Sequence, residues 1–160
     1  MKIVFGLMVA AMLMAGVWLS GTPDVVSAST STVESAIQER GREIVVPGGR
    51  LFSRVIRAGD FLFLSGALGR SRDGENGAGP ETQRALESLK GLLEQADSGV
   101  DDLVKCTIFL AEIADYGAMN EAYSAFFGEI APPARTALAA KELVNGAAVE
   151  VECMAYAPVG

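Results

Sequence analysis

The segment PPARTAL, Pro132 to Leu138, places one arginine among neighbours that cannot neutralise its charge. Two prolines precede Arg135, and the residues after it are small or apolar apart from one threonine. Because proline biases the backbone to extended conformations, the arginine is expected to enter a strand on a stiff segment. A guanidinium stays protonated and presents a planar fork of donors, which suits a carboxylate or a phosphate. Arg135 is therefore the first candidate for binding an anionic group.

Two carboxylates could pair with Arg135 or act beside it. Glu150 and Glu152 are two residues apart in the alternating segment AAVEVECMAYA, so in a strand both would leave the same face. One interpretation, which the pattern alone favours, is an ordinary ion pair between Arg135 and Glu150 at a subunit interface. The other is that the counter-ion of Arg135 arrives with a ligand.

The composition excludes several classes of function. The 160 residues include no histidine, which rules out Ser-His and Cys-His nucleophilic pairs and every His-ligated metal site. The formal net charge of -7 repels phosphate backbones, so nucleic acid is not expected as a partner. Any chemistry must use carboxylates, Arg, Lys, hydroxyls, backbone groups or water.

The N-terminal segment predicts export. Lys2 precedes an uninterrupted, uncharged apolar run, residues 3–19, and Val26 and Ala28 stand at the -3 and -1 positions of a small-residue cleavage site. Residues 1–28 are interpreted as a cleavable signal peptide, with a periplasmic or secreted location and no membrane association after cleavage. The alternative is a retained anchor, since 17 apolar residues are at the lower limit for spanning a bilayer.

The rest of the chain divides into a leader and one domain. Residues 29–41 are rich in polar residues and are expected to be flexible, whereas residues 42–160 suit a single hydrophobic core. The polar segment RSRDGENGAGP, residues 70–80, is interpreted as a surface loop, because it lacks phosphate-loop spacing.

Two helices are predicted from apolar residues at three- and four-residue intervals. The first covers Glu81 to Ala96, with three leucines on one stripe and Glu81 on the solvent side. The second begins after Asp115, its expected N-cap. The apolar stripe of this second helix is interpreted as core rather than as part of a ligand site: Tyr116, Met119, Tyr123, Phe126 and Phe127.

Strands are predicted around these helices. Residues 44–68 suggest a hairpin, and residues 134–140 and 148–157 suggest two C-terminal strands. Between the helices, alternation predicts a strand whose core-facing residues are Val104, Cys106, Ile108 and Leu110. This order predicts an α+β fold with both helices on one face of a mixed sheet. The second face would be left apolar and uncovered, which favours oligomerisation.

The two cysteines, Cys106 and Cys153, each lie in an apolar strand-like run. A cysteine in that setting usually behaves as a small buried hydrophobic residue, and this is the preferred interpretation. A disulfide is the alternative, and it would require the two strands to be neighbours.

Three segments resemble the Rid family, the reactive intermediate deaminases also called RidA/YjgF-like proteins. PPARTALAAKELVNGAAVEVECMAYA is similar to the family's C-terminal signature, and AGDFLFLSGAL is similar to its hairpin. VKCTIFLAEIADYGAMNEAYSAFF is similar to its strand followed by an Asn-x-x-Tyr-x-x-Phe-Phe helix. The resemblance covers about Arg50 to Ala157.

The resemblance implies a chorismate-mutase-like (Rid) fold assembled as a homotrimer, with pockets between subunits. It also implies hydrolysis of 2-imino or enamine acids to 2-oxo acids and ammonia, without a metal or an organic cofactor. Arg135 matches the arginine that binds the substrate carboxylate, and Glu150 matches the glutamate that positions the attacking water. Ser65 and Asn120 match further pocket positions.

Two pocket positions depart from the family's pattern. Phe52 stands where many active members carry a tyrosine, which removes a hydroxyl and keeps the aromatic wall. Ala137 stands where cysteine is frequent, which removes a thiol and leaves a backbone N-H for a ligand. Export is a third departure, because the familiar role of the family is cytoplasmic.

Two hypotheses result: an exported imine deaminase, or a non-catalytic trimeric module that binds a small carboxylate. Ribonuclease activity, also attached to the family's name, is disfavoured by the acidic charge.

Overall fold

The computed structural model describes residues 41–69 and 74–159. The predicted signal peptide, residues 1–28, lies outside the described residues, as does the predicted leader except for Gly41. No helix in the described part of the chain is long and apolar enough to cross a membrane.

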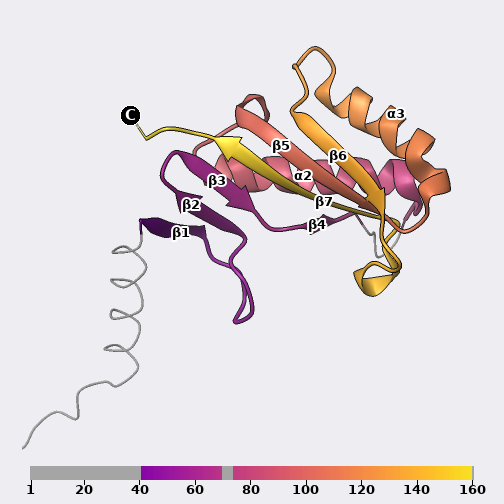
Figure 1. Cartoon of the computed structure of the whole chain (residues 1–160), viewed down its shortest axis with the longest axis horizontal. Helices are drawn as coiled ribbons and strands as arrows, with labels where there is room; N and C mark the ends of the chain where they lie inside the picture. Colours follow the sequence, from indigo (N-terminus) through magenta and orange to yellow (C-terminus); the bar gives the residue numbers. More distant parts are fainter. Residues whose placement is uncertain (1–40, 70–73, 160) are drawn as a thin grey trace, which may run out of the picture.

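Within these residues, two helices pack on one mixed sheet (Figure 1). The strands are β1 (Arg42–Val46), β2 (Val55–Ala58), β3 (Phe61–Leu64), β4 (Ala67–Leu68), β5 (Leu103–Leu110), β6 (Ala134–Ala139) and β7 (Val149–Tyr156). The helices are α2 (Ala78–Gln95) and α3 (Tyr116–Phe127). The sheet order is β1-β2-β3-β7-β5-β6, with β4 also beside β7. Among the described strands, β5 and β6 pair in parallel and all other pairs are antiparallel.

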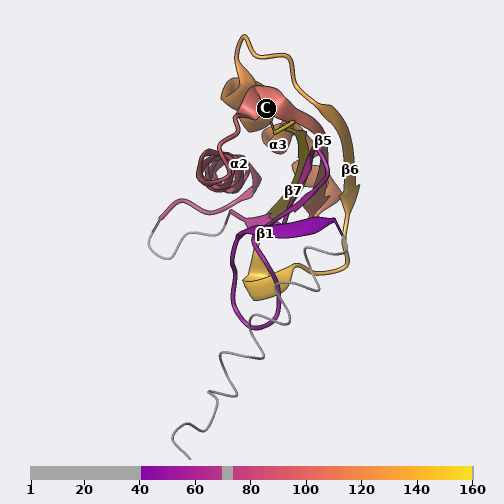
Figure 2. The same cartoon turned by 90° about the vertical axis from the view of Figure 1, so that its left-hand side faces the viewer.

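Both helices lie on the same side of the sheet, as Figure 2 shows from the end. This confirms the predicted α+β architecture. The core lies between the helices and the inward residues of the central strands. Those residues are almost fully buried: Cys106, Ile108 and Leu110 from β5, and Val149, Val151, Cys153 and Ala155 from β7. The leucine stripe of α2 closes the core from the other side, as its spacing predicts.

Val104 does not face the core as predicted and is 39% exposed. The pairing of β5 with β7 shifts register between Leu103 and Lys105, so one extra residue is accommodated there. Leu103 takes the buried position instead. A prediction from alternating residues assumes that every second side chain of a strand faces the core, so it cannot detect an extra residue within the strand.

The helix starts also differ from the prediction. Helix α2 begins at Ala78, after Gly77 at φ 104, and Glu81 is only 2% exposed rather than facing solvent. The Glu81 carboxylate accepts hydrogen bonds from the backbone N-H of Gly77 at 3.2 Å and of Ala148 at 2.7 Å. Glu81 therefore ties the start of α2 to the start of β7. Asp115 makes no side-chain cap, because a 3-10 turn of which it is the last residue leads directly into α3.

Cys106 and Cys153 form a disulfide, so their preferred interpretation as free buried thiols is wrong. The two residues are direct partners across the antiparallel β5–β7 ladder, with 4.1 Å between their Cα atoms. Both side chains point into the core, at 0% and 3% exposure. Strand register, which no local pattern in the sequence reports, brings the two sulfur atoms together.

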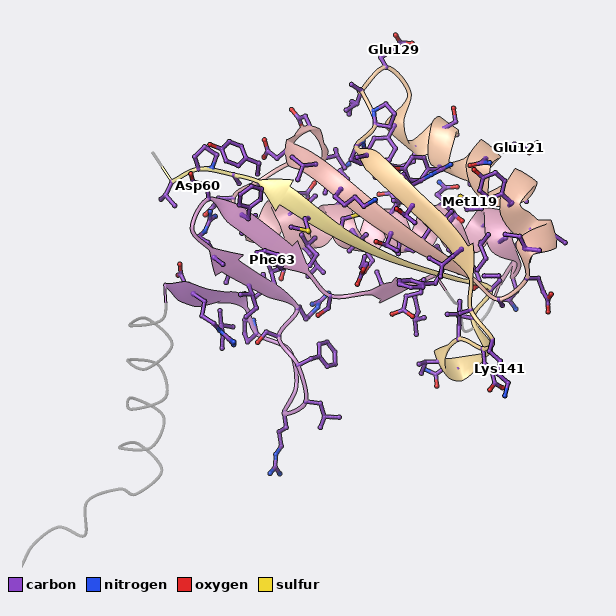
Figure 3. The ribbon with its side chains drawn as sticks, in the orientation of Figure 1. Asp60, Phe63, Met119, Glu121, Glu129 and Lys141 are labelled. Atoms are coloured by element: carbon purple, nitrogen blue, oxygen red, sulfur yellow. A yellow bond between two sulfur atoms is a disulfide. The ribbon has the colours of Figure 1, made fainter. Side chains whose placement is uncertain are left out.

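No helix of the described residues covers the face of the sheet opposite the helices, where exposed apolar side chains stand beside polar ones such as Lys105, Thr107 and Glu152. Four large apolar side chains there are between 39% and 46% exposed: Phe61, Phe63, Leu138 and Tyr156. Figure 3 labels Phe63, which projects from β3. We call this surface the open face. Its exposure agrees with the prediction of a second, uncovered face.

Removing the disulfide should lower the free energy of unfolding by about 2 to 4 kcal/mol, because the bond closes a long loop in the unfolded chain. The two cysteines are 47 positions apart in sequence. Urea unfolding of the wild type, with and without reductant, and of the double variant Cys106→Ala/Cys153→Ala measures this. Reductant should leave the double variant unchanged. Equal stability of oxidised and reduced wild type would contradict the expectation.

Candidate functional site

Arg135 lies on β6, with its side chain on the helix-covered side of the sheet. Nη1 of its guanidinium is 3.7 Å from the sulfur of Met119, and Nη2 donates to the hydroxyl of Tyr116 at 3.4 Å. Its Cζ lies 4.7 Å from the ring centroid of Tyr123 and 5.9 Å from that of Tyr116. Met119, labelled in Figure 3, lies between α3 and β6. All of these contacts therefore come from α3.

These partners orient the guanidinium and do not neutralise it. Among residues 41–69 and 74–159, no carboxylate forms an ion pair with Arg135; its guanidinium contacts a sulfur atom, a hydroxyl group and two aromatic rings, all of them uncharged. A cation-π contact contributes about 0.5 to 2 kcal/mol, whereas hydrogen bonds to charged groups contribute about 1.5 to 3 kcal/mol each. A ligand carboxylate that reaches Arg135 would therefore form stronger bonds with the guanidinium than the aromatic rings do, and it could bind with those ring contacts kept or displaced.

A hollow of about 480 Å³ opens beside Arg135. Asn120 from α3 supplies a polar amide to it, and the segment after α3 supplies Ile130 and Pro133. Tyr123 and Phe127 form an apolar wall. The structure thus brings two of the predicted pocket residues, Arg135 and Asn120, to one hollow. This hollow is suited to a small ligand that has a carboxylate and an apolar part.

Tyr123 belongs to both the core and this hollow. It is 6% exposed, packs on Phe127 with ring centroids 4.7 Å apart, and presents its ring to Arg135. Its hydroxyl is buried and has no hydrogen-bond partner among the described residues. Burial raises the pKa of the Tyr123 phenol above its usual value of 10.0, and the positive charge of Arg135 opposes that rise.

Ala137 is two residues beyond Arg135 on β6 and on the same face. It pairs with the buried Ile108 of β5 and packs against the core. Its side chain is a single methyl group, and it is not among the residues that line the hollow. We call Arg135, Asn120 and Ala137, the predicted residues on this side of the sheet, the arginine half-site.

The remaining predicted residues lie elsewhere in the fold. Glu150 points to the open face, and its carboxylate lies against Gly66, in the space that a Cβ atom on that residue would enter. Ser65, next to Gly66, donates a hydrogen bond from its hydroxyl to the carbonyl oxygen of Ser53 at 2.7 Å. That bond holds the β1–β2 loop, in which Phe52 is 59% exposed. Glu150, Ser65 and Phe52 form what we call the glutamate half-site.

The two half-sites do not meet within one chain. Arg135 pairs with Cys106, which pairs with Cys153, whereas Glu150 is three residues away from Cys153 along β7. The side chains are thus separated by about 10 Å along the strands and about 10 Å across them, and they leave opposite faces of the sheet. An ion pair between Arg135 and Glu150 of the same copy is therefore excluded by the geometry.

Tyr116 is a functional candidate that the sequence interpretation assigned to the core. It is 43% exposed, and its hydroxyl reaches the guanidinium of Arg135. The sequence feature that could have indicated this role is the spacing of Tyr116 from Asn120, since residues four apart lie on the same side of a helix.

No group of three or more potential ligand side chains is placed to hold a metal ion in the described residues.

Comparison with known proteins identifies the relatives of this fold. The family model described as Endoribonuclease L-PSP matches residues 47–157. A RutC family protein of Pyrococcus abyssi is 36% identical over 109 residues, which are 66% of this chain and 85% of that protein. A structure described as a putative endoribonuclease L-PSP from Entamoeba histolytica superposes with a TM-score of 0.62 at 34% identity, covering 69% of this chain and 91% of that one.

Two further relatives carry names that describe an activity. The chloroplastic Reactive Intermediate Deaminase A of Arabidopsis thaliana is 31% identical over 135 residues, covering 81% of this chain and 69% of that protein. A 2-iminobutanoate/2-iminopropanoate deaminase of Dermatophagoides farinae is 32% identical over 105 residues, covering 63% of this chain and 81% of that protein.

Replacing Tyr123 with phenylalanine should leave the protein as stable or up to about 1 kcal/mol more stable at neutral pH, because an unpaired buried hydroxyl is removed. The pKa of Tyr123 in the folded protein is raised above 10.0, its usual value in the unfolded chain. Above pH 10.0 the unfolded chain therefore loses the phenolic proton more readily than the folded protein does, which lowers the stability of the wild type as the pH rises. The advantage of Tyr123→Phe over wild type should therefore grow with alkaline pH. Urea unfolding followed by circular dichroism, at one chain concentration, measures both effects.

The exposed Tyr156, changed to phenylalanine, is the control for losing a hydroxyl. A loss of more than about 1.5 kcal/mol in Tyr123→Phe at neutral pH would show that this hydroxyl is hydrogen-bonded in solution, against the expectation.

Proposed function

The chain belongs to the endoribonuclease L-PSP family, which includes the YjgF and Rid proteins, and on that basis we propose that it hydrolyses 2-imino or enamine acids to 2-oxo acids and ammonia. The observation that carries this proposal is the Arg135 guanidinium beside a hollow, held by aromatic rings and paired with no carboxylate of the described residues. The deaminase names of the Arabidopsis and Dermatophagoides relatives support the choice of reaction.

Arg135 acts as the anchor of the substrate. Its fork donates to both oxygens of the substrate carboxylate, which fixes the plane of the adjacent C=N group. The Asn120 amide, on the same hollow, can bond to the imino or oxo group or to the carboxylate. Because an imine carbon is already electrophilic, orientation and a positioned water provide most of the catalysis required.

Glu150 positions the water and handles the protons. Its carboxylate accepts a hydrogen bond from the water and takes a proton as the oxygen bonds to C2 of the protonated imine. The same proton then passes to the nitrogen of the tetrahedral intermediate. As the C-N bond breaks and ammonia leaves, Glu150 takes the proton of the C2 hydroxyl, so that the C=O bond of the 2-oxo acid forms; the proton then passes to the released ammonia, which leaves as ammonium. One water is consumed, and Glu150 ends the cycle as the carboxylate.

The site is completed by a second copy of the chain. The arginine half-site and the glutamate half-site lie on opposite faces of one sheet, so one copy cannot present both to one ligand. Two copies can, if the glutamate half-site of one lies against the β6 edge of the next. The exposed apolar side chains of the open face favour such packing, and a closed ring of three copies with three equivalent clefts is the proposed assembly.

A binding module without catalysis is the second candidate function. It is favoured by Phe52, which brings a ring and no hydroxyl to the glutamate half-site, and by Ala137, which brings no thiol to the arginine half-site. Such a module would use the same cleft and the same arginine to hold a small carboxylate. An RNA substrate is a weaker proposal, because the formal net charge is -7.

Export is also part of the proposal, with residues 1–28 as a cleaved signal peptide. The buried Cys106–Cys153 disulfide supports this, since disulfides persist in oxidising compartments and are rare in the cytosol of mesophiles. The substrate would then be an imino acid that arises outside the cytoplasm.

Mixing two inactive variants should restore activity if the cleft is shared. Arg135→Ala and Glu150→Gln should each lose most of the ammonia release from 2-iminopropanoate generated in situ. After equimolar mixing, denaturation and joint refolding, about a quarter of the clefts would hold both intact residues, so about a quarter of wild-type activity should return. The two variants refolded separately and then mixed are the control.

Sedimentation of the same samples establishes whether the assemblies are trimers. No recovery in the refolded mixture, from variants that retain the wild-type oligomeric state, would contradict a shared cleft. A wild type that releases ammonia no faster than buffer, yet is thermally stabilised by a 2-oxo acid, would favour the binding module.

Export predicts a mature chain that begins at Ser29. Expression of the full chain with its N-terminal segment in a bacterial host, followed by fractionation and N-terminal mass spectrometry, tests this. An uncleaved chain in the membrane fraction would instead indicate a retained anchor.

A further inference from the structure

Tyr116 is the exposed member of the groups that contact Arg135. It is the first residue of α3, and it is 43% exposed, whereas Met119 and Tyr123 are buried at 0% and 6%. Tyr116 lies one helical turn before Asn120, so both side chains are on the side of α3 that faces β6. A ligand that approaches Arg135 from solvent can therefore reach Tyr116 without displacing a core residue.

The hydrogen bond between Tyr116 and Arg135 leaves the phenolic proton unused. A guanidinium can only donate, so the Tyr116 oxygen is the acceptor in the 3.4 Å contact with Nη2 of Arg135. The O-H of Tyr116 must then point to another acceptor. A hydroxyl that accepts from a cation is polarised, which makes it a stronger donor to the next group.

We propose that Tyr116 is a substrate-binding residue whose hydroxyl donates a hydrogen bond to the ligand carboxylate held by Arg135, an inference that rests on the proposed function. A carboxylate can accept from the guanidinium fork and from a phenol at the same time, because its two oxygens offer about four acceptor positions. Tyr116 and Arg135 already lie in contact, so little further ordering is needed when the ligand binds.

This assignment bears on the hydroxyl that Phe52 lacks. Phe52, on the glutamate half-site, has a ring without a hydroxyl. Here the chain has a phenol on the arginine half-site instead, from α3 rather than from the β1–β2 loop. A hydroxyl at position 52 and the hydroxyl of Tyr116 would therefore contact different parts of a ligand. Beside Arg135 the phenol selects for the carboxylate of the ligand and contributes to affinity rather than to the chemical step.

Tyr116→Phe tests the hydroxyl, because it keeps the ring and its contact with the guanidinium. We expect KM for 2-iminopropanoate to rise about 3- to 10-fold, with kcat within about 2-fold of wild type. Calorimetry should show the same weakening for 2-oxobutanoate. For 2-oxobutanamide, which has no carboxylate, the dissociation constants of wild type and variant should be equal.

Tyr156→Phe is the matched control. Tyr156 is 46% exposed and packs on Phe61, with ring centroids 5.4 Å apart, on the open face rather than beside Arg135. Its hydroxyl makes no contact with Arg135, so a Tyr156→Phe protein that sediments as the wild type does should have unchanged KM and dissociation constants.

The outcomes separate this inference from the proposed reaction. If Tyr116→Phe matches wild type, or weakens the acid and the amide equally, the inference is wrong and deamination stands. If wild type binds the oxo acid without hydrolysing the imine, the deaminase proposal is wrong, and the acid-to-amide ratio still decides the role of Tyr116. If wild type neither binds nor hydrolyses, both are wrong.

Discussion

A cation held by aromatic rings is the interaction on which the site of this protein depends. Arg135 enters from a stiff proline-led segment, and Tyr123 and Tyr116 of α3 lie 4.7 and 5.9 Å from it. The rings fix the position of the guanidinium, yet they cannot cancel its charge, so a small anion can still be bound strongly. A carboxylate from the protein itself at the same place would have removed that capacity. The family membership and the deaminase names of two relatives support the proposal that this anion is the carboxylate of an imino acid.

The pairing of β5 decides how the rest of the site is distributed. This strand runs parallel to β6 and antiparallel to β7, which puts Arg135 on the helix side and Glu150 on the open face. A sheet is two-sided, so groups on opposite faces cannot share one small ligand within a copy. The same sheet leaves exposed apolar side chains on a face that no helix of the described residues covers. Packing of copies would satisfy both conditions together, because it would bury the open face and bring unlike half-sites into one cleft.

The disulfide reinforces the part of the sheet that separates the two half-sites. Cys106 pairs directly with Arg135 in the β5–β6 ladder, and Cys153 is in the same strand as Glu150. Cross-linking β5 to β7 therefore maintains the register that sets the distance between these two candidate residues within one copy. A protein that works in an oxidising compartment can use such a bond, and a cytosolic one generally cannot.

The sequence alone determined the order of elements, the leucine stripe of α2 and the choice of Arg135, because these depend on local periodicity and on residue chemistry. Asn120 could be placed beside Arg135 only through family resemblance. The bulge at Leu103 to Lys105, the burial of Glu81 and the pairing of Cys106 with Cys153 required the tertiary structure. Each arises from contacts between residues distant in the chain, and strand register cannot be derived from alternation within one strand. Register also decided that Glu150 is out of reach of Arg135, and helix packing decided that Tyr116 lies beside it rather than in the core.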